Sequence, residues 1–166
     1  MEFKLRKWQP EDVESLVKYA NNSKIAKNLT NQFPHPYRKE DAIKFIQMTL
    51  SQQPTTIFAI EINGEAVGSI GLHPQTDVHL KNAELGYFLG EPYWGKGIMT
   101  AAIQQMVDYG FKTFEITRIF ARPFGTNFGS QRVLEKAGFV LEGRFEKILF
   151  KNGEYLDDLI YAVRKK

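Results

Sequence analysis

The sequence predicts an α/β fold with a mixed sheet. Strand-like and helix-like runs alternate along the chain, without internal repeats or low-complexity linkers. Two Asn-Gly pairs, Asn63-Gly64 and Asn152-Gly153, each join two β-rich runs, which is the strongest short-range signal for a hairpin. Residues 83–100 add a strand-like run that passes through a glycine-rich turn into a helix. With 166 residues, we expect one domain over residues 1–166.

The N-terminal half is expected to carry two longer helices ahead of a hairpin. Pro10 followed by Glu11 and Asp12 is typical of a helix start, and apolar residues then recur on one helical face. The prolines of Phe33–Pro36 remove donors and restrict their neighbours, so this segment is expected to be a loop. The expected elements are a strand at 3–8, helices at 10–20, 24–28 and 39–52, and strands at 57–62 and 66–72.

The C-terminal half continues the alternation and closes on a long hairpin. Gly138 is typical of a helix end, and the Asn152-Gly153 pair marks the last turn. The expected elements are a polar loop at 73–82, strands at 83–89 and 118–123, helices at 98–113 and 129–137, and hairpin strands at 139–150 and 154–163.

Composition excludes several classes of function. Lysine and arginine number 22 against 19 acidic residues, and this net charge of +3 is too small and too evenly spread to indicate a nucleic-acid surface. The chain has no cysteine, which excludes disulfides, thiolate metal sites and an acyl-cysteine intermediate. The N-terminus lacks an apolar signal region, and no apolar run approaches the roughly 20 residues of a membrane span. We therefore expect a cytoplasmic protein without metal, nucleic-acid or membrane partners.

Residues 83–100, AELGYFLGEPYWGKGIMT, have a pattern suited to anion binding. Gly95 and Gly97 allow the backbone to approach a phosphate closely. A helix that begins near Ile98 presents unpaired N–H groups and the positive end of its dipole. The alternative is an ordinary strand-to-helix turn, and a second segment further along the chain bears on that choice.

That segment runs from Asn127 to Phe139, NFGSQRVLEKAGF, and is followed by Glu142-Gly143. Together the two segments resemble the GNAT superfamily of acetyl-coenzyme A-dependent N-acetyltransferases. They are more closely similar to its RimJ/RimL branch of ribosomal-protein N-terminal acetyltransferases, whose pattern runs AExGY, YWGKG, NxxS and VLEKxGFxxEG. The likeness extends to LRKWQPEDVESL, FPHPYRKEDAIKFI and KNGEYLDDLIYAV, and so covers nearly the whole chain.

The resemblance implies a GNAT fold, with a mostly antiparallel sheet flanked by helices. Its strands at 83–89 and 118–123 would run parallel and splay apart at the cofactor site. It implies acetyl-coenzyme A as the cosubstrate and no metal, with the pyrophosphate over the backbone of residues 94–99. The family often has Gln or Arg where this chain has Pro92, so that side-chain contact is lost.

The cofactor-binding residues implied by the resemblance come from three short segments. Backbone groups at 87–89 would pair with the pantetheine arm, and one N–H there would face the thioester carbonyl as an oxyanion donor. Lys96 is alternatively a solvated surface lysine. The expected set is Tyr87, Phe88, Leu89, Trp94, Gly95, Lys96, Gly97, Ile98, Met99, Thr100, Asn127 and Ser130.

The resemblance also indicates the acid that protonates the departing thiolate. Much of the superfamily uses a tyrosine seven residues after the asparagine, but this chain has Leu134 there. Ser130 occupies the position used by the RimJ/RimL branch and is the candidate acid or hydrogen-bond donor. The alternatives are structural: Asn127 is also a typical helix N-cap, and serine is ordinary in a first helical turn.

Glu84 is the candidate base, because a carboxylate inside a half-buried strand needs a reason and is expected to have a raised pKa. It alternatively pairs with a cation or a backbone group. His35 is a lesser candidate, since a histidine between prolines is more often exposed. The acceptor pocket is expected to include Phe33, His35, Tyr37 and Asp157, although Asp157 equally suits a tie within the terminal hairpin.

We therefore expect direct acetyl transfer to a primary amine in a ternary complex, foremost a protein N-terminal α-amine. The alternatives are a small amine, such as an aminoglycoside or polyamine, and a non-catalytic acyl-coenzyme A-binding module. The exposed terminal hairpin is compatible with a homodimer. The sequence does not identify the acceptor.

Overall fold

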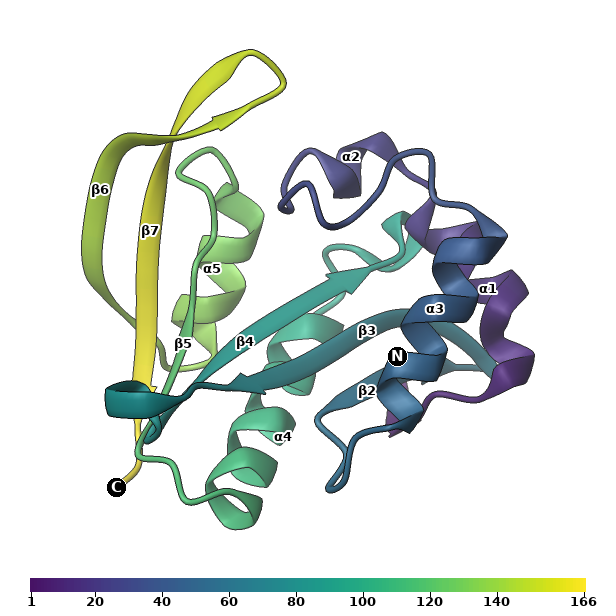
Figure 1. The fold of residues 1–166 in the computed structure, drawn as a ribbon, viewed down its shortest axis with the longest axis horizontal. Helices are drawn as coiled ribbons and strands as arrows, with labels where there is room; N and C mark the ends of the chain where they lie inside the picture. Colours follow the sequence, from purple (N-terminus) through teal and green to yellow (C-terminus); the bar gives the residue numbers. More distant parts are fainter. The chain divides into compact units, whose positions relative to one another are not determined.

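The computed structural model describes all of residues 1–166 and resolves them into two compact units (Figure 1). Unit 1 comprises residues 1–71 and 87–98, and unit 2 comprises residues 72–86 and 99–166. The strands follow the order β1-β2-β3-β4-β5-β7-β6 in a seven-stranded sheet. Strands β4 and β5 run parallel, whereas the pairs β1–β2, β2–β3, β5–β7 and β6–β7 are antiparallel. The expected mixed, mostly antiparallel sheet is therefore confirmed, while the single domain over residues 1–166 stays a prediction.

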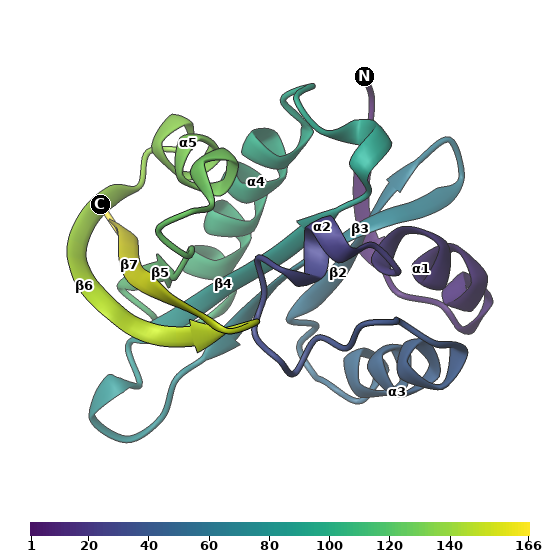
Figure 2. The same cartoon turned by 90° about the horizontal axis from the view of Figure 1, so that it is seen from above.

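Unit 1 packs two helices side by side, α1 and α3, as both views show (Figures 1 and 2). Its buried cluster joins Trp8, Leu16 on α1, Ile46 on α3 and Ile57 on β2, and Phe45 meets the Trp8 ring edge-on at 5.6 Å. The elements are β1 (Lys4–Lys7), η1 (Pro10–Asp12), α1 (Val13–Ala20), α2 (Ser23–Ala26), α3 (Lys39–Leu50), β2 (Ile57–Ile62), β3 (Glu65–Pro74, in unit 1 up to residue 71) and η3 (Glu91–Tyr93).

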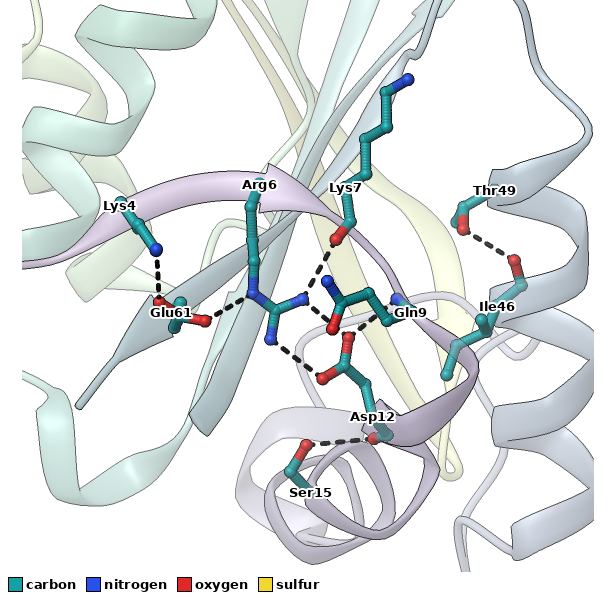
Figure 3. Close-up of polar contacts among 9 residues, drawn as sticks. All are labelled: Lys4, Arg6, Lys7, Gln9, Asp12, Ser15, Ile46, Thr49 and Glu61. Carbon is teal, nitrogen blue, oxygen red and sulfur yellow. Dashed lines mark hydrogen bonds and ion pairs between the residues drawn. The ribbon is translucent and has the colours of Figure 1, made fainter. Parts of the chain in front are cut away.

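A charged network ties the first strand of unit 1 to the start of the first helix (Figure 3). The Arg6 guanidinium donates to both Asp12 carboxylate oxygens, at 2.8 and 2.9 Å, and to Glu61 on β2 at 2.6 Å. Asp12 also accepts the backbone N–H of Gln9 at 2.8 Å, which caps the helix start expected at Pro10. Because these side chains are mostly shielded from water, the network fixes the corner between β1, β2 and η1.

Unit 2 is dominated by a long curved hairpin of β6 and β7, drawn in green to yellow in Figure 1. Its turn at Asn152-Gly153 has φ of 52° and 79°, and the β2–β3 turn at Asn63-Gly64 has φ of 51° and 81°, as Asn-Gly hairpin turns require. The elements are η2 (Asp77–His79), β4 (Asn82–Leu89, in unit 2 up to residue 86), α4 (Ile98–Thr113), β5 (Arg118–Ala121), α5 (Phe128–Lys136), β6 (Val140–Lys151) and β7 (Glu154–Arg164).

Several expected boundaries differ from the structure by one or two residues, and the ends of β3 and β5 have a clear cause in the backbone. The polar loop expected at 73–82 is partly strand, because β3 continues to Pro74 and Gln75 N–H still donates to the Asn82 carbonyl at 2.9 Å. His73 and Pro74 are exposed there, so hydrophobicity gave no sign that backbone pairing continues. The strand expected at 118–123 ends at Ala121, two residues before Pro123, which has no N–H for a ladder.

Candidate functional site

The glycine-rich turn lies directly before α4, and both of its glycines adopt a conformation that other residues rarely take. Gly95 and Gly97 have φ of 73° and 78°, in the left-handed region that favours glycine. A Cβ built at either position would meet nothing within 4 Å, so the space beside this backbone is open. Ile98 and Met99 are buried and anchor the first turn of α4, whereas Lys96 is exposed. The turn can thus offer backbone N–H groups to an anion.

The residues before this turn are held by contacts within unit 1. The Trp94 indole N–H donates to the Leu89 carbonyl at 2.7 Å, although 43% of this residue stays exposed. The Tyr93 ring lies edge-on to Tyr19 of α1, with centroids 5.9 Å apart. The indole hydrogen bond holds Trp94 in place, and the exposed part of its side chain can meet a ligand.

Glu91, at the start of η3, is fixed by α2 and the residue that caps it. Its carboxylate accepts from the Lys24 ammonium at 2.8 Å and from the Asn22 side chain at 2.9 Å. These donors hold the pKa of Glu91 below its usual value, with Lys24 as the main cause. The segment that leads into the glycine turn is therefore attached to the N-terminal helices.

The backbone at Phe88 rests on a glycine of β3. A Cβ added at Gly68 would lie 2.6 Å from the Phe88 carbonyl oxygen and 3.1 Å from the Leu89 Cα. Close by, Gly90 N–H donates to the Val67 carbonyl at 2.8 Å. Only glycine at position 68 permits this approach, so it determines where the 87–89 backbone lies. Sequence reasoning missed Gly68, because nothing distinguishes it from other strand glycines.

The structure brings one expected acceptor residue beside an expected cofactor residue. The Phe33 ring packs edge-on against Phe88 at 5.5 Å and lies 5.1 Å from the Tyr37 ring. Tyr37 is only 5% exposed, and its burial, with a smaller contribution from Asp41, raises its pKa to about 12. Tyr37 therefore belongs to the core of unit 1, while His35 is exposed as expected.

Glu84 lies on β4 with its Cα paired in parallel register to Phe120 of β5. It is partly buried, and burial raises the pKa of its carboxyl group, the direction expected of a candidate base. Arg122 and His73 oppose this rise through their charges, and Asp158 adds to it. A carboxylate whose pKa is raised toward neutrality accepts a proton more readily than an ordinary glutamate.

Arg122 and Asp158 form an ion pair that sequence reasoning did not find. The Arg122 guanidinium donates to Asp158 on β7, where the Asp158 side chain is only 2% exposed and that of Arg122 is 46% exposed. This bond raises the pKa of Arg122. The available signal was the position of Asp158 among apolar residues of a strand, since a buried carboxylate requires a partner.

Asn127 caps α5, as the structural alternative proposed. Its side-chain oxygen accepts the backbone N–H of Ser130 at 3.2 Å. Ser130 lies partly buried in the first turn of the helix. Leu134 is fully buried, so this position contributes to the core. Asn127 and Ser130 are thus brought together, and their roles toward a ligand stay predictions.

Asp157 ties together three segments of unit 2. Its carboxylate accepts from the Arg144 guanidinium at 2.7 Å and from the backbone N–H of Lys147 at 3.0 Å. These bonds, the Lys147 N–H foremost, lower its pKa. Its carbonyl accepts the N–H of Gly125 at 2.9 Å, in the loop that leads to Asn127. This geometry favours the hairpin tie that the sequence left open.

No helix of the chain is both long enough and apolar enough to pass through a membrane.

Comparison with known proteins gives a consistent family match. The model of the acetyltransferase (GNAT) domain matches residues 2–140. The chain is 29% identical over 166 residues to an uncharacterized N-acetyltransferase of Bacillus licheniformis, covering 98% of this chain and 92% of that protein. A candidate ribosomal N-acetyltransferase of Bacillus subtilis is 35% identical over 104 residues, 63% of this chain and 56% of that protein. The spermidine N(1)-acetyltransferase of Escherichia coli is 27% identical, covering 92% and 80%.

Solved structures share the fold over almost the whole chain. The microcin C7 self-immunity acetyltransferase, solved with acetyl-CoA and AMP, superposes with a TM-score of 0.82 at 27% identity, covering 99% of this chain and 93% of that one. RimL, a ribosomal alpha-N-protein acetyltransferase solved with coenzyme A, gives a TM-score of 0.85 at 23% identity, covering 98% and 93%, and supports the fold alone.

Proposed function

The chain belongs to the GNAT acetyltransferases, and on that premise we propose that it transfers the acetyl group of acetyl-coenzyme A to a protein N-terminal α-amine. The observation that carries the proposal is the turn at Gly95 and Gly97. Its two positive φ angles, the open space beside it and the helix that follows form a cradle suited to a pyrophosphate. Acetyl-coenzyme A supplies an activated thioester. The protein has to bind this cosubstrate, orient the acceptor amine toward it, and accept and donate the protons of the reaction.

Proton transfer is assigned to Glu84 and Ser130. Glu84 takes the proton from the attacking amine, directly or through one water, because its raised pKa makes it a better acceptor than an exposed glutamate. The amine nitrogen first forms a bond to the carbonyl carbon, which gives a tetrahedral intermediate, and the carbon–sulfur bond breaks when this intermediate collapses to the amide. Ser130 donates a hydrogen bond or a proton to the sulfur that leaves. A backbone N–H among residues 87–89 would stabilise the oxyanion of the intermediate.

The pKa of the acceptor favours an α-amine. An N-terminal amine has a reference pKa of about 7.7–8, against about 10.4 for lysine, so much of it is already neutral at physiological pH. The ribosomal name of one relative supports a protein acceptor, and the spermidine acetyltransferase among the relatives keeps a polyamine as the second candidate.

A thiol-release assay with acetyl-coenzyme A tests the proposal. The acceptor panel contains N-terminal peptides, the same peptides with a blocked α-amine, polyamines and aminoglycosides. We expect release with free α-amines and none with the blocked peptides. Faster release with a polyamine would move the assignment to small amines. Binding of acetyl-coenzyme A without release for any amine would identify a non-catalytic module and overturn the proposal.

A further inference from the structure

The face of β4 that carries Glu84 continues across two neighbouring strands of unit 2. Glu84 pairs with Phe120, and Phe120 pairs with Ala162 of β7. Asp158 lies four residues before Ala162 on β7 and shares its face, whereas Arg122 directly follows the end of β5, two residues after Phe120. Arg122 thus lies two residues past Phe120, the β5 partner of Glu84, and its charge acts on the Glu84 carboxylate.

Two carboxylates, those of Asp158 and Glu84, are possible partners for the Arg122 guanidinium. It is hydrogen-bonded to the buried Asp158, whereas it acts on Glu84 only through its charge. An arginine that instead formed a bidentate pair with Glu84 would occupy the lone pairs a base needs and would stabilise its ionised form. Asp158 offers no open approach to an acceptor, since it is 2% exposed.

The other charged groups around Glu84 are already accounted for. On β5, Arg118 donates to Asn82 at 2.9 Å and to Glu142 at 2.7 Å, so its guanidinium is engaged elsewhere. From β3, His73 acts on Glu84 through charge alone. Whether Arg122 pairs with Asp158 or with Glu84 therefore decides whether the Glu84 carboxylate stays available to take a proton.

We propose that Asp158 is a positioning residue that holds the Arg122 guanidinium away from Glu84, so that Glu84 remains free to take a proton from the acceptor amine. The proposal deepens the proposed function and rests on it. Asp158 never contacts the amine; besides the direct effect of its charge on Glu84, it acts by fixing the Arg122 guanidinium.

The two partners of the ion pair should shift the protonation of Glu84 in opposite directions. Asp158→Asn removes a negative charge and releases Arg122 toward Glu84, so the Glu84 pKa falls. Arg122→Gln removes the cation, so it rises, while Arg122→Lys keeps the charge and stays near the wild type. A purely structural role would lower the activity of both variants and would not shift the Glu84 pKa in opposite directions.

Two readouts test this. The first is carboxyl NMR of ¹³C-glutamate-labelled protein, in which Glu84→Gln assigns the signal and no turnover is needed. The second is the pH dependence of kcat/KM on the best amine. For each variant, kcat/KM at acidic pH is divided by the plateau value of the same variant and compared with the wild-type ratio. We expect this ratio to be about threefold higher for Asp158→Asn and lower by a similar factor for Arg122→Gln.

Shifts in the same direction, or none, in the NMR titration would overturn the proposal, whatever the enzyme does. Should Asp158→Asn fail to fold, the contrast between a raised Glu84 pKa in Arg122→Gln and an unchanged one in Arg122→Lys decides it, because Arg122 is the more exposed partner of the ion pair. Loss of acetyl transfer to every amine in the wild-type protein would instead refute the proposed function, and the NMR result would still stand.

Discussion

Replacement of Gly97 separates the strain of the turn from its capacity to bind an anion. At φ of 78°, any residue with a Cβ costs about 1–2 kcal/mol of backbone strain, and the open space around the position adds no clash. Gly97→Ala and Gly97→Asp should therefore lose similar stability. Both should stay folded, since the free energy of unfolding of a domain is typically about 5–15 kcal/mol. The alanine variant is thus the matched control for the charge of the aspartate.

The added charge of Gly97→Asp should weaken the affinity for coenzyme A relative to Gly97→Ala, without a further loss of stability. A carboxylate about 5 Å from a phosphate, at an effective dielectric constant of about 20, is repelled by about 3 kcal/mol. Salt and exposure reduce this to about 1.5–2 kcal/mol, which is a ten- to thirtyfold weaker affinity than that of Gly97→Ala. Isothermal titration calorimetry at two salt concentrations measures the gap, which should narrow at high salt. Equal affinities for the two folded variants would refute the pyrophosphate assignment.

Three further predictions follow from the described contacts. Glu84→Gln should lower the acetylation rate most at low pH, and the rate should recover partly as the pH rises toward the amine pKa, whereas Ser130→Ala should lower the rate by about 10–100-fold at most, almost independently of pH. Matched pH–rate profiles compare the two variants, and a Glu84→Gln defect that stays constant with pH would mean that Glu84 is a structural carboxylate. The pKa of Glu61 is lowered chiefly by its bond from Arg6, so this carboxylate stabilises the fold above its unfolded pKa of about 4.3, and the stability is lost as the pH falls through the lowered native pKa. Glu61→Gln should cost about 1–2 kcal/mol in urea unfolding at pH 7 and progressively less as the pH is lowered, and a cost that does not change with pH would contradict the charge pairing. Intact-mass spectrometry after incubation with acetyl-coenzyme A alone should show no acetylated species that turns over, because the chain has no cysteine; a kinetically competent adduct would disprove direct transfer.

Local signals predicted most of the fold. The Asn-Gly turns placed both hairpins, and the apolar periodicity gave α4 its exact bounds, since these patterns depend on neighbouring residues alone. The misplaced ends of β3 and β5 depend on backbone hydrogen bonds, which side-chain character does not report. The extension of β3 to Pro74 depends on a ladder that continues beneath exposed side chains.

The candidate site was predictable where a short motif carries the chemistry. The glycine-rich turn ahead of a helix could be read from its motif, and the raised pKa of Glu84 was expected of a carboxylate in a half-buried strand. The partnership of Arg122 and Asp158 was out of reach because it joins residues 36 positions apart. Pairing between β5 and β7 brings them together, and a single sequence does not specify that pairing.

The contact between Gly68 and Phe88 has a consequence for variation in this protein. A methyl group at position 68 would have to displace the Phe88 carbonyl from 2.6 Å, and the backbone that moves is the stretch expected to line the pantetheine arm. Residue 68 touches no predicted ligand, so a screen for variants with weakened acetyl-coenzyme A use would recover it without any sign of a binding role. An inherited or engineered alanine there would resemble a cofactor-site lesion, although its origin is steric and lies one strand away.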